Sequence, residues 1–439
     1  MKFKKALIAM LIAAGLTAGA AEIKCAVTPD YSVMPAGKAR TGVVQVSLSG
    51  GMVAASGPRP SVNFALVIDR SGSMQGKKIV HAREAACAAV NQLDAGDFVS
   101  VVIFDDTCET IVPEQSAAEK EAIIEKINAI TPRGGTAIFE GVSRGAAEIR
   151  KQLGKTKINR VILLSDGCAN VGPSTPEELG RLGAALKKEG ISVSTVGVGT
   201  DYNEDLMLNL SQNSDGNSYF VENSDDLPRV FAAEIGNALT VAATQVSLSV
   251  KFAAGFVPVA LVGRDGRISG DTVTVDFNQI YAGQEKYVLV KADIPPFNAG
   301  EKADFAVATV TFTDPRTDKR QTVTATGAAA FSDDKEAVKA SLNRKVLKDA
   351  ALNLNAQVSE TALSLSDDGE IDGANALLDR AVFELKAVKE EIGEDADISA
   401  AVKSLTTFAE SVKQNSVSGA MRKALKTENF QLRNQQNVR

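Results

Sequence analysis

Hydrophobic and polar residues alternate along the chain near its start, and the same alternation returns after about residue 239. In the first stretch, Val44, Val46 and Leu48 alternate with polar residues. Later runs of the same kind lie at 246–252, 273–277, 286–291, 303–312 and 321–325. A period of two predicts strands with one buried face. We expect the early strand to pair with the later region, so that residues 22–60 and 239–332 form one antiparallel β-sandwich domain.

The pattern between these regions is different, because continuous apolar runs alternate there with segments of helical period. The runs lie at 62–68, 98–104, 160–164 and 192–198. Uninterrupted apolar strands separated by helices are typical of a parallel sheet covered on both faces. We therefore predict a doubly wound α/β domain with a mostly parallel sheet over residues 61–238, inserted in the β domain. A turn after residue 104 and a short return strand predict an antiparallel edge hairpin.

The last quarter of the chain is rich in Ala, Leu, Lys and Glu at helical spacing. Three such segments, 336–365, 371–391 and 398–425, predict a helical hairpin or bundle over residues 333–428. The remaining residues, 429–439, are rich in Asn and Gln, and we expect a flexible tail.

The first residues have the layout of a secretory signal peptide. Basic residues precede the apolar run Ala6–Leu16, and small residues follow it up to Ala21. The run is shorter than the roughly 20 residues that span a bilayer. We expect residues 1–21 to be removed on export, leaving a chain with no membrane span. The expected destination is the periplasm, with the cell surface or the extracellular space as the alternative.

The cysteine content bears on disulfide bonding, and the charge bears on whether the chain binds nucleic acid. Four cysteines follow the predicted cleavage site, which permits three full disulfide pairings without a choice among them: Cys25, Cys87, Cys108 and Cys168. The net charge of -6 is spread along the chain, and aromatic residues are few. Nucleic-acid binding therefore has no support.

Side chains with oxygen atoms gather at the ends of two predicted strands and in one loop. Asp69, Ser71 and Ser73 follow the run at 62–68, Asp166 follows the run at 160–164, and Thr136 lies in a Gly-Gly-Thr loop. Ligands of open α/β sheets bind at the carboxyl ends of the strands. Oxygen donors without His or Cys suit a hard divalent cation.

This set, Asp69-Arg70-Ser71-Gly72-Ser73 with Thr136 and Asp166-Gly167, resembles the metal-ion-dependent adhesion site of a von Willebrand factor A domain. The resemblance covers residues 63–237. It implies that Ser71 and Ser73 bind the ion directly, Thr136 directly or through water, and Asp69 and Asp166 directly or through waters. Magnesium is the first choice, with calcium or manganese as alternatives. With few anionic ligands the ion keeps an open position, which the resemblance assigns to an Asp or Glu of a protein partner.

The flanking regions resemble the arrangement in secreted bacterial proteins related to inter-alpha-trypsin inhibitor heavy chains and calcium-activated chloride channel regulators. Some relatives of the latter have been linked to metalloprotease activity, but this chain has no His-Glu-x-x-His motif. We therefore expect no protease activity.

Two other function classes compete with an adhesion or complex-assembly role. One is a metal-dependent phosphoryl-transfer hydrolase with Asp69 as nucleophile. Phosphatases that open in this way carry a second carboxylate two residues on, where this chain has Ser71. The other is a structural envelope protein whose metal only holds loops together. We expect a non-enzymatic binding protein, and the oligomeric state stays open. Arg70 is expected to fix the neighbouring loop or to meet an acidic partner.

Overall fold

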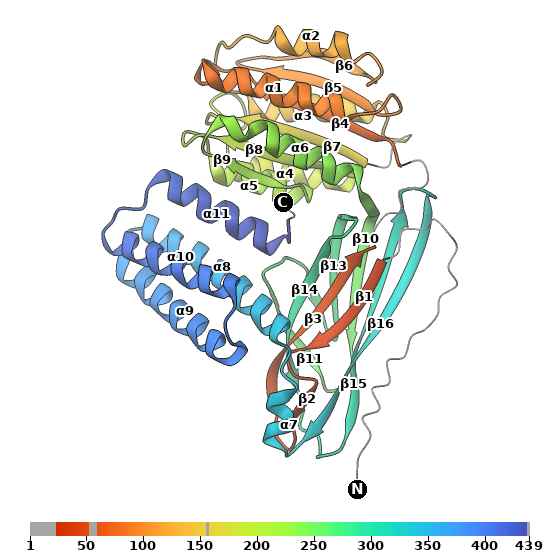
Figure 1. Ribbon diagram of the computed structural model, residues 1–439, viewed down its shortest axis with the longest axis vertical. Coiled ribbons are helices and arrows are strands. Elements are labelled where there is room, and N and C mark those ends of the chain that lie inside the picture. Colours follow the sequence, from red (N-terminus) through yellow and green to blue (C-terminus); the bar gives the residue numbers. More distant parts are fainter. Residues whose placement is uncertain (1–22, 52–58, 155–157, 437–439) are drawn as a thin grey trace.

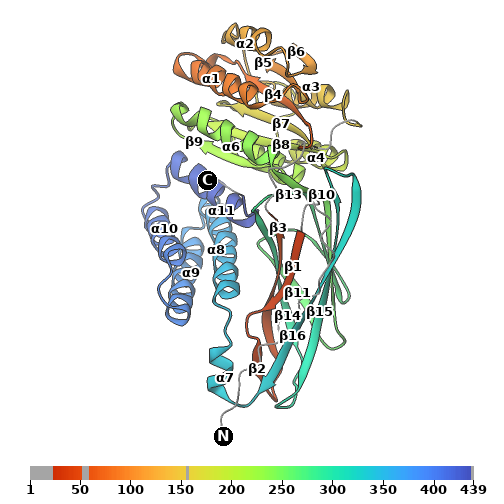
Figure 2. The ribbon, with the colours of Figure 1, turned by 45° about the vertical axis from the view of Figure 1, so that its right-hand side comes forward.

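The computed structural model describes residues 23–51, 59–154 and 158–436 (Figure 1). The predicted signal peptide lies outside the described residues. Three parts make up the molecule: an α/β domain at one end, a long β domain, and a helical unit beside both (Figures 1 and 2).

The α/β domain is built on a six-stranded sheet in the order β6-β5-β4-β7-β8-β9. β4 pairs in parallel with β5 on one side and β7 on the other. β6 runs antiparallel at the edge, which confirms the predicted hairpin. The strands are β4 (Val62–Asp69), β5 (Phe98–Phe104), β6 (Cys108–Ser116), β7 (Ile158–Ser165), β8 (Ile191–Val198) and β9 (Ser218–Val221).

Helices cover both faces of this sheet because successive residues of each apolar strand point to opposite sides. In β4, Phe64 and Leu66 pack in the core beneath α1, α2 and α6, whereas Ala65 and Val67 pack beneath α3, α4 and α5. The helices are α1 (Lys77–Gln92), α2 (Lys120–Asn128), α3 (Ile138–Arg150), α4 (Pro176–Lys188), α5 (Glu204–Ser214) and α6 (Leu227–Leu239). The sheet is therefore buried on both faces, as its continuous apolar strands require.

The β domain combines strands from before and after the α/β domain. β3 pairs antiparallel with β14, with Val46 opposite Val288, so the predicted insertion and fold class are confirmed. One sheet has the order β1-β3-β14-β11 and the other β12-β13-β10-β15-β16-β2. The strands are β1 (Ile23–Pro29), β2 (Val33–Pro35), β3 (Arg40–Gly50), β10 (Val241–Phe252), β11 (Val257–Val262), β12 (Arg267–Ser269), β13 (Thr272–Tyr281), β14 (Glu285–Ile294), β15 (Lys302–Asp314) and β16 (Lys319–Ser332).

The helical unit differs from the prediction in two places. The segment 398–425 is not one helix, because the chain turns after α10 at Asn415, which has a left-handed φ of 50°. The tail prediction is also wrong for the described residues 429–436, since α11 continues to Arg433 and Gln436 is buried. The helices are α7 (Lys335–Ala340), α8 (Arg344–Asp367), α9 (Ile371–Ile392), α10 (Ala396–Lys413) and α11 (Gly419–Arg433).

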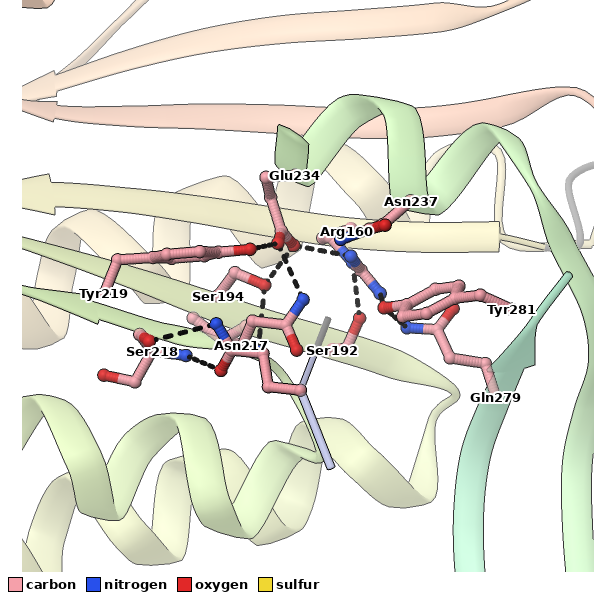
Figure 3. A network of polar contacts seen from close by, with 12 residues as sticks. Arg160, Ser192, Ser194, Asn217, Ser218, Tyr219, Glu234, Asn237, Gln279 and Tyr281 are labelled. Atoms are coloured by element: carbon pink, nitrogen blue, oxygen red, sulfur yellow. Dashed lines mark hydrogen bonds and ion pairs between the residues drawn. The ribbon is translucent and has the colours of Figure 1, made fainter. Parts of the chain in front are cut away.

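A buried polar network joins the α/β domain to the β domain (Figure 3). Arg160 of β7 forms an ion pair with Glu234 of α6 at 2.5 Å, and both side chains have no exposed surface. The other end of the Arg160 guanidinium donates to the Tyr281 hydroxyl of β13 at 2.7 Å. Because these groups come from three elements of two domains, the network holds the last helix of the α/β domain and the β domain in one arrangement.

The structure also bears on the predictions about disulfides and membrane spans. All four cysteines are free thiols, so none of the three possible pairings is present. Within the described ranges, no helix has both the length and the apolar character needed to span a bilayer.

Candidate metal centre

Two neighbouring strands deliver the predicted carboxylates to the same edge of the sheet. β4 ends at Asp69, and Asp166 directly follows β7. The parallel register sets Ile68 opposite Leu164, which brings Asp69 level with Ser165. Both carboxylates have no exposed surface. The apolar strands thus carry two charged groups into a buried position at the carboxyl edge.

Asp69 organises the loop that follows it. Its Oδ1 accepts a hydrogen bond from the Ser71 backbone N–H at 2.7 Å, and its Oδ2 accepts one from the Ser165 hydroxyl. Burial raises the pKa of Asp69 to about 6, although the hydrogen bonds from Ser165 and Ser71 act in the opposite direction. A cation beside this carboxylate would favour its ionised form.

The two serine hydroxyls connect the first loop to the second carboxylate. Ser71 Oγ lies 3.0 Å from Ser73 Oγ. Ser73 Oγ donates to Asp166 Oδ1 at 2.7 Å. The loop after β4 therefore places its two hydroxyl groups next to each other and next to Asp166.

Backbone hydrogen bonds bring the loop of Thr136 to the same place. Gly72 N–H donates to the Gly134 carbonyl at 3.1 Å. Thr136 and Asn170 exchange two hydrogen bonds, from Thr136 N–H to Asn170 Oδ1 at 2.8 Å and from Asn170 N–H to the Thr136 carbonyl at 3.1 Å. A Cβ on Gly167 would lie 3.2 Å from Thr136 Oγ1 and 3.5 Å from Ser73 Oγ. Both hydroxyls therefore lie close to Gly167, and a larger residue there would crowd the Thr136 hydroxyl.

The structure thus places all five predicted side chains around one spot. Its oxygen donors belong to two carboxylates and three hydroxyls: Asp69, Asp166, Ser71, Ser73 and Thr136. Across the described part of the chain, no cluster of three or more His, Cys, Asp or Glu side chains is suited to hold a metal. The donor set of carboxylate and hydroxyl oxygens, with few anionic ligands, suits a hard divalent cation.

Arg70 fixes a neighbouring loop, the first of its two expected roles. Its Nε donates to Asp105 Oδ2 at 2.8 Å, and Arg133 Nε donates to the same oxygen at 2.7 Å. Burial works to raise the pKa of Asp105, but hydrogen bonds from Arg133 and Thr107 and the charge of Arg70 outweigh it and hold the value at about 2. Asp105 therefore stays ionised and ties the two loops of the site together.

Sequence reasoning missed Lys78, Asn170 and Ser165. The Lys78 ammonium forms an ion pair with Asp166 Oδ2 from the first turn of α1. No pattern in the sequence separates Lys78 from its neighbour Lys77, so its role required the structure. Ser165 could have been noted, since it stands next to Asp166 at the end of an apolar strand. The single histidine, His81, lies in α1, where its Nδ1 is 2.8 Å from Ser224 Oγ and not among the five predicted site residues.

Residues 63–233 match the family model of the von Willebrand factor type A domain. The chain contains a von Willebrand factor type A domain. This A domain accounts for the whole parallel sheet and for all five predicted site residues.

Curated relatives extend the similarity beyond the A domain. An uncharacterized protein of Synechocystis sp. is 28% identical over 44% of this chain and 46% of its own length. Inter-alpha-trypsin inhibitor heavy chain H3 of Homo sapiens is 27% identical over 57% of this chain and 28% of its own length. The chain thus spans less than half the length of these relatives.

Solved structures with similar folds cover almost the entire chain. A von Willebrand factor type A protein from Catenulispora acidiphila matches with a TM-score of 0.69 at 17% identity, over 88% of this chain and 89% of its own. The ArnB paralog VWA2 from Sulfolobus acidocaldarius matches with a TM-score of 0.59 at 17% identity, over 94% and 98%. The arrangement of A domain, β domain and helices therefore occurs in other proteins of this kind.

Proposed function

We propose that the A domain binds one divalent cation, magnesium in the first place, and uses it to capture an Asp or Glu side chain of a protein partner. The proposed ligands are Asp69, Ser71, Ser73, Thr136 and Asp166. The protein would act without catalysis, in adhesion or in the assembly of a complex, after export to the periplasm.

The observation that carries the proposal is the way in which the oxygen donors are held before any ion arrives. Hydrogen bonds join the loop of Ser71 to the loop of Thr136, and Asn170 joins the latter to the loop of Asp166. Donors fixed in this way lose little conformational freedom on binding. An ion held mainly by hydroxyls and water keeps much of its positive charge, so a carboxylate from outside can complete its shell.

The environment of Asp69 argues against the hydrolase alternative. A nucleophilic carboxylate needs a free oxygen facing the substrate. Asp69 has no exposed surface, and each of its oxygens already accepts a hydrogen bond, from Ser71 and from Ser165. These contacts suit a residue that supports the loop and the ion.

A hydroxyl deletion tests the metal site with little risk to the fold. Thr136→Ala should weaken Mg²⁺ or Mn²⁺ binding about tenfold or more, measured by isothermal titration calorimetry on chelator-treated protein. The matched control is Thr361→Ala, at an exposed position of α8. Equal metal affinity in the two variants would remove Thr136 from the site.

Partner capture is tested with the full chain as bait in envelope extract. A specific partner should bind in Mg²⁺, be released by EDTA, be lost with Thr136→Ala and be retained with Thr361→Ala. A partner that stays bound in EDTA would contradict the proposed mechanism. Magnesium-dependent hydrolysis of para-nitrophenyl phosphate, abolished in Asp69→Asn, would establish the hydrolase instead.

A further inference from the structure

A second polar pocket lies far from the metal centre, at the seam between the A domain and the β domain. Its volume is about 630 Å³, and the ends of α4 and α5 line it together with β10, β13 and the turn after β11. α4 and α5 end where β8 and β9 begin, so this is the amino edge of the parallel sheet, opposite to Asp69 and Asp166. Figures 1 and 2 show this end of the A domain above the β domain.

Two buried cations and one buried carboxylate lie at and next to this seam pocket: Arg264 and Asp215 line it, and Lys286 lies on the ring of Phe277 next to it. Arg264 and Lys286 are both buried, and both lie over the ring of Phe277, at 4.5 and 5.8 Å from its centroid. The buried carboxylate beside them is Asp215, whose side chain is 8% exposed. Buried charges are normally paired, so one carboxylate between two cations leaves one positive charge without a partner.

The hydrogen bonds of Asp215 show why it does not satisfy Arg264. Its Oδ2 accepts from the backbone N–H of Asn278. Its Oδ1 lies 3.9 Å from Arg264 Nη1, which is too long for a hydrogen bond. Arg264 Nη2 donates to Asn434 at 3.3 Å, but Arg264 Nε is buried and finds no hydrogen-bond partner among the described residues. An unpaired buried donor costs free energy that a ligand can recover.

We propose that this pocket binds a small oxyanion, a phosphate or carboxylate group, through the Arg264 guanidinium, with the Lys286 ammonium as the second positive charge. A guanidinium presents a planar fork of donors that matches the oxygens of such groups. Lys187 and Lys188 add positive charge at the mouth. The carboxylates Glu189, Asp265 and Asp276 also line the mouth, but they are exposed and therefore screened by solvent, and Glu189 is already paired with Arg150. Because both domains line the pocket and Asn434 after α11 accepts a hydrogen bond from Arg264, a bound anion would connect all three parts of the molecule.

The test titrates the full chain with inorganic phosphate and, separately, with succinate, at constant ionic strength and in EDTA so that the metal centre plays no part. We expect one equivalent to bind in calorimetry and the thermal unfolding temperature to rise with ligand concentration. Arg264→Gln should weaken binding at least tenfold, whereas Arg267→Gln, an exposed arginine on β12, should leave it unchanged. Preference for phosphate or for succinate identifies the class of oxyanion.

Two results would overturn the proposal. One is the absence of both heat and stabilisation with either anion up to about 10 mM, a concentration at which even a millimolar site is largely filled. The other is equal affinity in Arg264→Gln and Arg267→Gln. If Arg264→Gln fails to fold, as judged by circular dichroism, Lys286→Met takes its place and the same comparison decides.

Discussion

The ammonium group of Lys78 forms an ion pair with Asp166, a carboxylate that has no exposed surface. A metal ion at the proposed site would bring a second positive charge to the same carboxylate. The lysine therefore both stabilises the metal-free site and competes with the ion. These opposing effects can be separated, because one concerns the stability of the metal-free protein and the other concerns metal affinity.

Replacing Lys78 by methionine should reveal both effects. The metal-free protein should lose about 1–3 kcal/mol of unfolding free energy, since Asp166 is left buried with less compensation. Magnesium affinity should rise several-fold, because the competing charge is gone. Thermal unfolding in EDTA and calorimetric titration measure the two quantities. Lys77→Met, at the exposed position next to it, is the matched control, and equal metal affinity in the two variants would contradict the competition.

At the scale of single residues, the sequence was enough to predict the residues of the motif. It was not enough to predict the contacts that support them. Asp69 and Asp166 follow uninterrupted apolar strands, so parallel pairing alone brings them to one edge. Their role as metal ligands stays a prediction. Lys78 and Asn170 reach the site from a helix and from a loop, and nothing in their local sequence states where those elements will lie.

At the scale of elements, α11 is the part of the helical unit that docks on the A domain. Lys423 and Arg422 of α11 bind the two oxygens of Glu204, the first residue of α5, at 2.7 and 2.6 Å. Burial works to raise the pKa of Glu204, but the two cations keep it below its ordinary value. Acidic residues at the start of a helix also interact favourably with its dipole, so Glu204 connects the two helices while stabilising one of them.

Lys423→Met should loosen this contact without unfolding either domain. The Lys423 side chain is 6% exposed and that of Glu204 is 9% exposed, so removing the ammonium leaves a largely buried carboxylate with one cation. We expect the contact to weaken by about 1–3 kcal/mol, seen as faster hydrogen exchange in α11 and in the first turn of α5. Lys413→Met breaks an exposed pair with Asp379 and is the control. Identical exchange in the two variants would show that α11 is held by other contacts.

The limits of prediction at this scale follow from long-range contacts. The helices of the A domain were predictable because apolar strands alternate with helical periods. The order of residues 429–436 was not predictable, because their polar side chains are held by partners that are distant in the sequence. Gln436 accepts from the backbone of Ser218, and Asn434 accepts from Arg264, across more than 160 positions of sequence. Asn and Gln residues, which are typical of flexible segments, here form hydrogen bonds where the domains meet.

At the scale of the whole molecule, the insertion of the A domain creates two connections to the β domain, one entering β4 and one leaving α6. α6 continues almost directly into β10, since the helix ends at Leu239 and the strand begins at Val241. Glu234 on this helix accepts hydrogen bonds from Ser194, Asn217 and Tyr219 in addition to its ion pair with Arg160 (Figure 3). Arg160, which Glu234 holds in place, donates to Tyr281 of β13, and movement of the A domain against the β domain would have to break this contact.

Glu234→Gln should therefore destabilise the junction as a whole. It leaves the Arg160 guanidinium, which has no exposed surface, without its counter-charge, and breaking such a buried pair costs about 3 kcal/mol or more. Differential scanning calorimetry measures the loss, and Glu384→Gln, which removes one partner of an exposed pair with Arg380, is the control. If the two variants unfold at the same temperature, the network does not stabilise the junction.

The difference in unfolding free energy between the wild type and Glu234→Gln should become smaller at low pH. Burial works to raise the pKa of Glu234, but the charge of Arg160 and the hydrogen bonds from Asn217, Ser194 and Tyr219 hold it below its ordinary value. The stability that Glu234 contributes is thus fully present above its unfolded pKa of about 4.3 and is lost as the pH falls through the lower folded value. The variant has no such group to protonate, so its deficit should be largest at neutral pH and shrink on acidification. A deficit that grew instead would mean that the pair is not ionised in the native protein.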